Sequence, residues 1–432
     1  MTGSVKSAER VLAAEAGARV GVRVRVAGWV HARRDLGGIS FLVIRDRSGI
    51  VQCVFERRAD ALPAPESVVT VEGAVATAVQ APGGYEVRAD AIEVLYSVPG
   101  ATPIEVAKED RALPDTRLDH RALSLRGLEQ RAILRVEAAL VAGFRDALAG
   151  LGFTEISTPK VVAGNAEGGA NVFAIDYFDR PASLTQSPQL YKQIMVGAYE
   201  RVFETGPVYR AEQHATSRHL NEYLSLDFEM GFIESSEDVM NTETEVLRVM
   251  LATVAERCRA ELALLGASLP PVPARIPRLT LAAAVQTIRD RYAFENRGDD
   301  LDPEAERLLS RYALEALGSE WLFVTEWPAG IRPFYAYRTG DGLTDTFDLL
   351  FRGLEVTTGG RREQDPARLR ERLAERGLPE AAFAGYLEAF DYGLPPHGGL
   401  AIGAERLTAR LLELANIRLA RAFPRDRNRL TP

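Results

Sequence analysis

The sequence is poor in lysine and in cysteine. Of its 432 residues 52 are basic, yet only four of these are lysines: Lys6, Lys108, Lys160 and Lys192. Arginine occupies nearly every other basic position, so each remaining lysine marks a place where a compact ammonium differs in use from a planar guanidinium. The two cysteines, Cys53 and Cys258, form no CxxC pair. This excludes a zinc ribbon and a disulfide scaffold and indicates a reducing, cytoplasmic environment.

Other absences exclude further classes of protein. The N-terminal residues 1–10 are polar, so we expect no signal peptide. No apolar run approaches the roughly 18 residues of a membrane span. No lysine follows a glycine, which excludes a GxxxxGK[ST] phosphate loop, and no GxGxxG follows a strand pattern. The net charge of -8 argues against a protein that simply coats nucleic acid.

Residues 19–95 alternate between apolar and polar side chains in segments separated by Gly, Pro and Asp. About five short strands in roughly 80 residues predict a small β-barrel, although periodicity alone leaves a sandwich open. The first 50 residues carry nine basic and four acidic side chains, a local excess of positive charge in an acidic chain. Such an excess is compatible with a partner-facing patch and with an ordinary solvated surface.

The rest of the chain mixes helical and strand patterns. Residues 97–130 are rich in Pro and charge, lack periodicity and predict a linker or hinge. The later patterns predict helices at 131–149 and 236–265, strands at 153–157, 200–209, 222–232 and 346–358, and a glycine turn with a helix at 397–416.

Residues 200–232 contain two strand patterns around a polar loop, which predicts an antiparallel hairpin with a long connection. Arg210 stands at the end of the first strand, and Glu212 points the same way two residues later. The period of two places Ser225, Asp227 and Glu229 on one face of the returning strand. This polar group is costly unless it binds something polar, although a salt-bridged sheet surface is the alternative.

A second polar group lies near the C-terminus. Three glycines precede the predicted helix, with Arg406 in its first turn. A helix N-terminus with close glycine backbone attracts phosphate, and a cation there predicts an anionic partner. Upstream, Asp348 and Glu355 lie seven residues apart, and Arg362 follows after seven more. Odd spacing separates strand faces unless a bulge or strand end intervenes, so the question is whether both carboxylates reach one Mg²⁺.

These segments together resemble the three signature motifs of class II aminoacyl-tRNA synthetases. Over essentially its whole length the chain resembles aspartyl-tRNA synthetases of the archaeal type, and it has no HIGH or KMSKS segment of the other class. The first motif resembles the helix at 131–149 with the segment GFTEISTP that ends at Pro159. The second resembles residues 207–229, PVYRAEQHATSRHLNEYLSLDFE, and the third resembles residues 399–407, GLAIGAERL.

The resemblance implies an α+β fold with an OB-fold anticodon-binding barrel at 1–100, a hinge at 101–130 and a class II catalytic domain at 131–432, built on an antiparallel sheet flanked by helices. It implies a homodimer joined through the first motif. The implied reaction activates L-aspartate with ATP to aspartyl-adenylate and transfers it to the 3′-hydroxyl of the terminal adenosine of tRNA(Asp). Positioning and charge neutralisation dominate such chemistry.

The resemblance also assigns site residues. It implies that Arg210 holds the α-phosphate of ATP, that Arg406 meets the γ-phosphate, and that Asp348 and Glu355 bind Mg²⁺. The other implied ATP-binding residues are Glu212, Arg218, His219, Tyr223 and Glu355. The implied aspartate-binding residues are Glu167 on a mobile lid, Ser187, Gln189, Lys192, Asp227 and Arg362, with Lys192 and Arg362 on the side-chain carboxylate.

In the barrel the resemblance implies stacking of an anticodon base on Phe41 and hydrogen bonding by Gln52, with Arg34 and Glu86 beside them. An aromatic residue in a barrel is otherwise more often part of the core. His31 and Pro82 resemble residues found at the corresponding positions of enzymes that also charge tRNA(Asn). The alternative is that they are an ordinary loop histidine and an ordinary turn proline. We therefore expect a non-discriminating enzyme whose product on tRNA(Asn) feeds a tRNA-dependent amidotransferase.

One departure keeps a sibling function open. The family pattern GGQRIH is replaced by GGRREQ at residues 359–364, and the glutamate after Arg362 resembles asparaginyl-tRNA synthetases. Lys192 argues against that alternative, because an ammonium prefers a carboxylate to an amide. A non-catalytic tRNA-binding relative is the alternative of another class, and the set of Arg210, Asp348, Glu355 and Arg406 argues against it.

Overall fold

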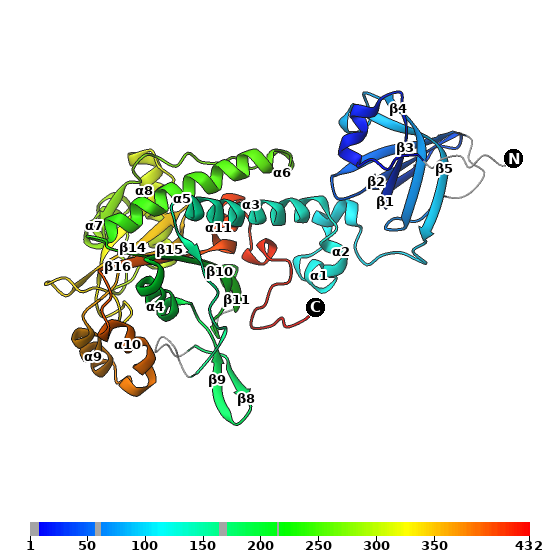
Figure 1. Cartoon of the computed structure of the whole chain (residues 1–432). Helices are drawn as coiled ribbons and strands as arrows, with labels where there is room; N and C mark the ends of the chain where they lie inside the picture. The colour runs from blue at the N-terminus through cyan, green and yellow to red at the C-terminus, as the bar shows by residue number, and fades with distance from the viewer. Residues whose placement is uncertain (1–7, 57–61, 164–170, 214–215) are drawn as a thin grey trace. The chain divides into compact units, whose positions relative to one another are not determined.

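The N-terminal unit is a closed β-barrel. The computed structural model describes residues 8–56, 62–163, 171–213 and 216–432, and contacts divide the chain into Met1–Arg131 and Ala132–Pro432 (Figure 1). Five strands close in the order β1-β2-β3-β5-β4, which confirms the predicted barrel over the sandwich. Their bounds are β1 (Arg23–Asp35), β2 (Ile39–Arg45), β3 (Ile50–Glu56), β4 (Val68–Thr77) and β5 (Tyr85–Tyr96).

Alternation along each strand decides which side chains fill the barrel. In β2 the side chains of Ser40, Leu42 and Ile44 are buried on one face of the strand. Phe41 points to the opposite face and is only half-buried. Valines of β1, β3, β4 and β5 complete the interior. Phe41 is therefore not a core residue, and the apolar interior is formed without it.

The segment predicted as a hinge contains short helices. They are η3 (Val106–Arg111), α1 (Pro114–Asp119) and α2 (Arg121–Ser124), preceded in the unit by η1 (Ala13–Arg19) and η2 (Pro82–Gly84). Elements of one or two turns are too short to produce a visible helical period, which explains why the sequence pattern missed them. Contacts group this segment with the barrel.

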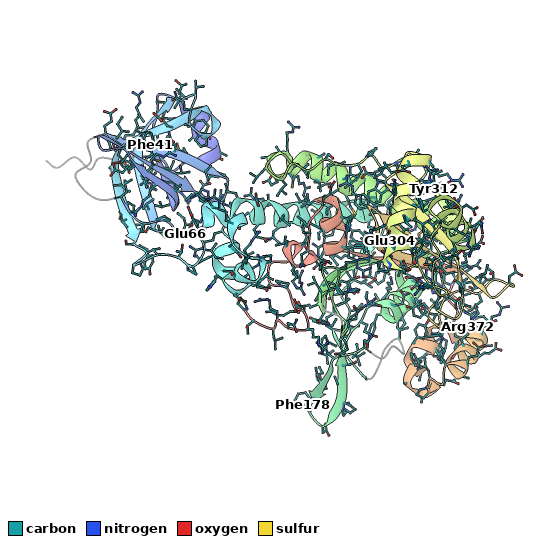
Figure 2. The ribbon with its side chains drawn as sticks, turned by 180° about the vertical axis from the view of Figure 1, so that it is seen from behind. Phe41, Glu66, Phe178, Glu304, Tyr312 and Arg372 are labelled. Carbon is teal, nitrogen blue, oxygen red and sulfur yellow. The ribbon has the colours of Figure 1, made fainter. Side chains whose placement is uncertain are left out.

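The C-terminal unit is built on an eight-stranded sheet in the order β12-β13-β14-β15-β16-β11-β10-β6. Its six central strands are antiparallel, and only the outer pairs β12/β13 and β10/β6 are parallel. The strands are β6 (Thr154–Glu155), β10 (Arg201–Tyr209), β11 (Glu222–Gly231), β12 (Arg278–Thr280), β13 (Trp321–Pro328), β14 (Leu343–Phe351), β15 (Leu354–Arg361) and β16 (His397–Gly403). A separate small sheet contains β7 (Val161–Val162), β8 (Ala174–Tyr177) and β9 (Arg180–Leu184), and Phe178 stands at the tip of its hairpin (Figure 2).

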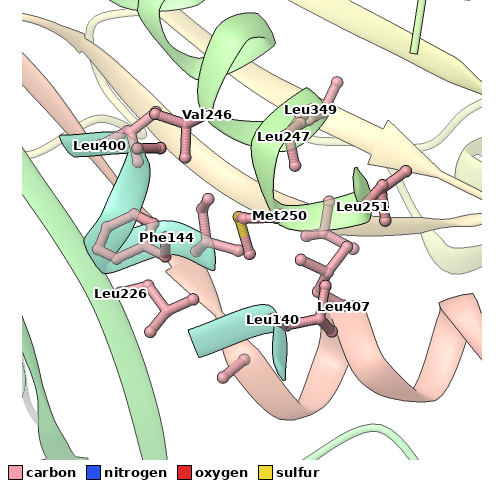
Figure 3. Packing of buried hydrophobic residues seen from close by; sticks show 14 of the residues in the cluster. Leu140, Phe144, Leu226, Val246, Leu247, Met250, Leu251, Leu349, Leu400 and Leu407 are labelled. Atoms are coloured by element: carbon pink, nitrogen blue, oxygen red, sulfur yellow. The ribbon is translucent and has the colours of Figure 1, made fainter. Parts of the chain in front are cut away.

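Helices cover the large sheet and complete its core. Leu140 and Phe144 of α3 pack with Leu247 and Met250 of α5 and with Leu407 of α11 (Figure 3). The helices are α3 (Leu128–Gly150), α4 (Gln189–Tyr199), α5 (Ser236–Arg257), α6 (Arg259–Leu265), α7 (Leu281–Tyr292), α8 (Pro303–Leu317), α9 (Pro366–Glu375), α10 (Ala384–Asp391) and α11 (Ala404–Leu411), with η4 (Glu380–Phe383) and η5 (Ile417–Ala420). This α+β architecture confirms the expected fold class. Among the described residues, no helix is both long enough and apolar enough to cross a membrane.

Three local predictions were wrong. The single strand predicted at 346–358 is a hairpin, β14 and β15, because Arg352 and Gly353 turn the chain with φ of 45° and 81°. The predicted glycine turn before the last helix is strand β16. Its glycine at position 399 is needed because a Cβ there would lie 2.1 Å from the carbonyl oxygen of Phe228. The predicted helix at 236–265 breaks into α5 and α6 at Cys258.

Candidate active site

The second and third sequence motifs form neighbouring strands. β11 pairs with β10 on one side and with β16 on the other, so Ser225 lies opposite both Gly206 and Gly403. Gly403 is also the N-cap of α11, which places Arg406 in the first turn beside the hairpin. β15 lies on the far side of β16 and brings Glu355 to the same region. Residues separated by up to about 200 positions therefore meet at one end of the sheet.

One pocket contains every residue that the sequence predicts for ATP. Glu355 Oε1 lies 3.6 Å from the Arg406 guanidinium, which also donates to the Glu355 carbonyl oxygen at 3.3 Å. Glu355 is thus the anionic partner that the sequence predicts for Arg406. The guanidinium of Arg210 lies 5.8 Å from the centre of the Tyr223 ring. The predicted residues that line the pocket are Arg210, Glu212, Arg218, His219, Tyr223, Glu355 and Arg406.

Residues of the connection between β10 and β11 bond to one another and to a glutamate of α8. Arg218 forms an ion pair with Glu306 of α8. The His219 ring bonds to the Thr216 hydroxyl at 2.6 Å, and its other nitrogen lies 3.7 Å from Glu212. Sequence reasoning missed Glu306, because nothing in the α8 segment marks one glutamate of an amphipathic helix as a partner of a loop about 90 residues earlier.

Asp348 and Glu355 reach the same region in spite of their odd spacing. A β-bulge shifts the register between Leu349 and Leu350, and the hairpin turn lies between the two carboxylates. Thr358, whose hydroxyl bonds Asp348, lines the same pocket as Glu355. Burial and then the Asp348 carboxylate raise the pKa of Glu355 to about 7. Asp348 itself accepts from Arg332 at 2.6 Å and from the Thr358 hydroxyl.

This carboxylate pair fits a hard divalent cation by its chemistry. Both groups supply oxygen donors, and a bound cation would offset the burial and the Asp348 charge that raise the pKa of Glu355. Within the described ranges, no group of three or more His, Cys, Asp or Glu side chains is arranged to hold a metal. The pair would therefore need phosphate and water oxygens to complete an octahedral Mg²⁺ shell.

Lys192 lies at the centre of a second, fully buried polar cluster. Its side chain is 1 % exposed. The ammonium lies 3.1 Å from Asp227 Oδ1 and 3.3 Å from Glu229 Oε2, and it donates to the Leu400 carbonyl oxygen at 2.9 Å. Asp227 is also bonded to the Ser225 hydroxyl. The predicted face of Ser225, Asp227 and Glu229 is confirmed, and its counterion is Lys192.

Arg362 and Gln189 complete this cluster around Glu229. Arg362 Nε donates to Glu229 Oε1 at 3.0 Å, and Arg362 Nη2 donates to Gln189 Oε1 at 3.3 Å. Gln189 and Lys192 lie three residues apart on α4, and the Ser187 hydroxyl accepts from the Gln189 backbone N–H at 3.1 Å. Burial raises the pKa of Glu229, but the charges of Arg362 and Lys192 outweigh it and hold that pKa below its ordinary value. Sequence reasoning placed Glu229 on this face without recognising that both cations meet at its carboxylate.

The glutamate that replaces the family's expected residue after Arg362 is bound by the protein itself. Glu363 is fully buried and accepts from Arg372 at 2.6 Å and from the Gln364 backbone N–H at 3.1 Å. His397, to which the sequence assigned no role, is buried next to Arg362, whose backbone N–H donates to the His397 carbonyl oxygen at 2.8 Å. The carboxylate at position 363, where the sequence departs from the family pattern, is thus neutralised by an ion pair with Arg372. The predicted lid residue, Glu167, lies outside the described residues.

The four predicted anticodon residues share one outer face of the barrel. They line a pocket of about 380 Å³ (Phe41 in Figure 2): Arg34, Phe41, Gln52 and Glu86. Arg34 lies directly opposite Phe41 in the β1/β2 ladder. The Gln52 side-chain amide donates to Glu86 at 3.1 Å across β3 and β5. A half-buried aromatic ring beside an arginine and a satisfied amide is an arrangement that suits a stacked base.

The two predicted discrimination residues occupy different environments. Pro82 begins η2, in the loop before β5, as the sequence pattern suggests. His31 is not a loop residue: it is the extra residue of a β-bulge in β1, between Val30 and Ala32. It is buried and bonds Arg45 at 2.9 Å, and burial and then the Arg45 charge lower its pKa to about 4. His31 is therefore neutral at physiological pH.

Comparisons with known proteins agree with this geometry. A family profile described as tRNA synthetases class II (D, K and N) matches residues 113–427, and one described as OB-fold nucleic acid binding domain matches residues 24–95. Proteins from Deinococcus radiodurans and Thermus thermophilus, both named Aspartate–tRNA(Asp/Asn) ligase, are 54% and 55% identical. The matches cover 98% of this chain in each case and 99% and 100% of those proteins. The crystal structure of asparaginyl-tRNA synthetase from Pyrococcus horikoshii complexed with asparaginyl-adenylate is similar with a TM-score of 0.91 and 32% identity, covering 98% of this chain and 100% of that one.

Proposed function

The chain belongs to the class II tRNA synthetases of the D, K and N group, and from that premise we propose that it is an aspartate–tRNA ligase acting on tRNA(Asp) and tRNA(Asn). The single observation that carries the proposal is the buried cluster in which Lys192 and Arg362 face Asp227 and Glu229, directly beside the pocket of Arg210 and Arg406. The names of the relatives from Deinococcus radiodurans and Thermus thermophilus support the same activity.

In the first step aspartate is activated with ATP. An oxygen of the α-carboxylate attacks the α-phosphorus, the bond from that phosphorus to the bridging oxygen breaks, and pyrophosphate leaves with the bonding electrons. Arg210 would hold the α-phosphate, and Arg406 would neutralise the leaving phosphates. Tyr223 would stack against the adenine, with Glu212, Arg218 and His219 around it. Glu306 would keep Arg218 in position through their ion pair.

The second step gives aspartate to tRNA. The 3′-hydroxyl of the terminal adenosine attacks the carbonyl carbon of the aspartyl-adenylate, and AMP leaves. The barrel would bind the anticodon through stacking on Phe41 and hydrogen bonds from Gln52, with Arg34 and Glu86 beside them. Pyrophosphate exchange needs only the first step, so the two steps can be measured separately.

A divalent cation is part of the proposal. Asp348 and Glu355 would hold Mg²⁺, which when bound supplies charge neutralisation to the phosphates of ATP. The chain's own contribution is to keep the two carboxylates together and to orient Asp348 through Arg332 and Thr358. Arg406 lies 3.6 Å from Glu355 and would share it with the cation.

Selection of aspartate would rest on the cluster around Lys192. A bound aspartate side chain would be attracted by Lys192 and Arg362, while Asp227 orients the ammonium and Gln189 and Ser187 line the approach. Glu167 remains a proposed lid residue. Hydrogen bonds from Lys192 and Arg362 to the side-chain carboxylate of aspartate would be stronger than those to the neutral amide of asparagine, which favours aspartate over the asparaginyl alternative.

Charging of both tRNAs would depend on the barrel. Pro82 and His31 are the proposed positions that accept the anticodon of tRNA(Asn) as well as that of tRNA(Asp). Aspartyl-tRNA(Asn) carries the wrong amino acid for its codon, so this activity would supply a tRNA-dependent amidotransferase. We further propose that the enzyme is a cytoplasmic homodimer joined through the segment from α3 to Pro159, which sedimentation at several concentrations tests.

Pyrophosphate exchange tests the activity. The purified chain is incubated with ATP, Mg²⁺, labelled pyrophosphate and either aspartate or asparagine, without tRNA. We expect label in ATP with aspartate and less than a hundredth of that rate with asparagine. Exchange with asparagine alone would replace the proposal by the asparaginyl function, and no exchange with either would support a non-catalytic tRNA-binding relative.

A further inference from the structure

Two residues of the barrel without an assigned role hold the ring of His31. Arg45 of β2 is 2% exposed, and its Nη1 lies 2.9 Å from His31 Nδ1. The same Nη1 donates to Glu66 Oε1 at 2.9 Å, and Arg45 Nη2 donates to Glu66 Oε2 at 2.8 Å. Two parallel bonds between a guanidinium and a carboxylate fix the guanidinium in position. Arg45 is therefore held against the His31 ring by Glu66.

Glu66 is itself fixed by its backbone and by a second cation (Glu66 in Figure 2). It is buried and has a φ of 66°, a conformation that a glutamate adopts only where the surrounding structure imposes it. Its backbone N–H donates to the carbonyl oxygen of Val30, the neighbour of His31 in β1, at 2.7 Å. Arg126 donates to Glu66 Oε2 at 3.0 Å. The carboxylate that orients Arg45 is thus attached to the bulge that carries His31.

The bond from Arg45 decides which nitrogen of His31 carries the proton. A guanidinium has five N–H donors and no acceptor, so His31 Nδ1 must accept in this bond and carries no proton. Burial and then the Arg45 charge lower the pKa of His31 to about 4, so the ring is neutral and has one proton. That proton is therefore on Nε2, and Nε2 is a permanent hydrogen-bond donor.

This donor is available to a ligand. Within the part of the chain that the structure describes, Nε2 bonds to no other residue and its surface is not fully enclosed. His31 lines a pocket of about 750 Å³, and Ala32, Arg33 and Arg34 line both this pocket and the one that contains Phe41. Adjacent pockets with shared arginines suit neighbouring bases of one strand, because the cations meet the phosphates between the bases.

The chemistry of the bases shows what a permanent donor distinguishes. The anticodons of tRNA(Asp) and tRNA(Asn) differ in their last base, which is cytosine in the first and uracil in the second. Uracil has a carbonyl oxygen at position 4, where cytosine has an amino group. A group that only donates bonds to the oxygen and not to the amino group. Such a donor adds binding energy for tRNA(Asn), whereas a histidine that is free to change tautomer bonds to either base.

We propose that Arg45 and Glu66 are positioning residues that hold His31 Nε2–H as a permanent donor to the 4-carbonyl oxygen of the last anticodon base of tRNA(Asn). The inference rests on the proposed function and explains how His31 acts in it. Arg45 and Glu66 do not touch the base and act through the orientation and the tautomer of the ring. The ion pair of Arg45 and Glu66 thereby contributes to the choice of tRNA.

Modified tRNA(Asn) tests the bond with the unaltered full-length protein. One tRNA carries 4-thiouridine as its last anticodon base, and the matched control carries 2-thiouridine at the same place. Sulfur is a weaker hydrogen-bond acceptor than oxygen. We expect 4-thiouridine to raise KM for tRNA(Asn) about fivefold, as loss of one hydrogen bond predicts, and 2-thiouridine to change it less than about twofold. In a His31→Leu variant the two modified tRNAs should behave alike.

Variants of Arg45 and Glu66 test the positioning. Arg45→Lys keeps a donor toward His31 Nδ1 and should keep the sensitivity to 4-thiouridine. Arg45→Gln supplies an amide oxygen that accepts from Nδ1, so it permits the other tautomer and should lose that sensitivity. Its KM for tRNA(Asn) should rise about fivefold, with KM for tRNA(Asp) and pyrophosphate exchange without tRNA within about twofold. Glu66→Gln keeps one acceptor for Arg45 and should weaken the sensitivity without abolishing it.

The tautomer can be read directly, and a control variant isolates the effect. With ¹⁵N-labelled histidine, nuclear magnetic resonance of the wild type should show His31 with a bare Nδ1 and a protonated Nε2, assigned by the signals that His31→Leu removes. The same spectrum of Arg45→Gln should show a change at this residue alone. Arg23→Gln breaks an exposed ion pair with Glu72 in the same barrel and should match the wild type in every assay.

Several results would overturn the inference. They are a protonated Nδ1 in the wild type, an equal response to the two thiouridines, and a larger response to 2-thiouridine, which would mean that the donor reads the carbonyl shared by both bases. Equal losses on both tRNAs in Arg45→Gln, with its sensitivity to 4-thiouridine retained, would show that Arg45 only stabilises the barrel. If the wild type charges no tRNA(Asn) with unmodified uracil, the proposed function fails first, and that outcome is distinct from the others.

Discussion

Removing the positive charge of Lys192 should destabilise the catalytic unit to a degree that depends on pH. The buried cluster contains two carboxylates, Asp227 and Glu229, and two cations, Lys192 and Arg362, so its charges balance. In a Lys192→Met variant the two carboxylates of the cluster share one remaining cation, Arg362. Breaking a buried ion pair on one side typically costs about 3–5 kcal/mol of stability.

The variant can limit that cost by taking up a proton at Glu229. For a carboxyl with an ordinary pKa of 4.5, protonation at pH 7 costs about 3.4 kcal/mol. We therefore expect the variant to lose about this much unfolding free energy at pH 7. In the wild type the pKa of Glu229 lies below 4.5, so this group gives no stability slope above that pH. In the variant the folded pKa is raised instead, so stability falls by about 1.4 kcal/mol per pH unit above 4.5.

Urea unfolding at pH 5 and pH 7 measures the effect. Trp321 and Trp327, both buried in the catalytic unit, report its unfolding by fluorescence. We expect the difference between wild type and variant to shrink by about 2.7 kcal/mol from pH 7 to pH 5. A difference that is the same at both pH values, or below about 1 kcal/mol at pH 7, would refute the charge-balance argument.

Lys192→Arg is the matched control for charge. It keeps the cation, so the pH-dependent difference should be absent. It should nevertheless lose aspartate activation, because a side chain that is 1 % exposed leaves no room for the larger planar guanidinium. A Lys192→Arg enzyme with full aspartate-dependent exchange would show that the compact ammonium is not required.

Three further predictions concern the other sites. Arg406→Ala should lower the exchange rate at least about 100-fold without changing the melting temperature, because its guanidinium lines an open pocket; initial rates and calorimetry check this. Phe41→Ala should raise KM for tRNA about tenfold in charging assays by removing a base-stacking surface, with exchange unaffected. Pro82→Ala and His31→Leu should lower charging of tRNA(Asn) more than that of tRNA(Asp). Equal losses on both tRNAs would show that these residues do not determine which tRNA is charged.

The elements with strong local periodicity were the most predictable part of the fold. Alternating valines predicted the barrel, and the two strand patterns around the Arg210 loop predicted the β10–β11 hairpin. The β14–β15 hairpin was missed, because its two-residue turn contains one glycine and a non-glycine residue with positive φ, which no turn pattern marks. Strand β16 was missed because its glycines serve close strand contacts rather than a turn.

The site was predictable where a motif carried it and not where tertiary contacts complete it. The motif resemblance named seven residues that line one pocket. The role of Glu229 as the meeting point of Lys192 and Arg362 depends on α4, β11 and the residue after β15 coming together, which no local pattern encodes. The same holds for the ion pair between Glu306 and Arg218. The burial of His31 was also not predictable, because it depends on a β-bulge whose position is set by the pairing register of β1 and β2.

Charging of purified tRNA(Asp) and tRNA(Asn) with labelled aspartate measures the proposed activity itself. The reactions contain ATP, Mg²⁺ and the full-length chain, and acid-precipitable label is measured for each tRNA separately. We predict that both tRNAs accept aspartate and that neither accepts asparagine. Charging of neither tRNA with aspartate would contradict the proposed function, and charging of tRNA(Asp) alone would contradict its non-discriminating character.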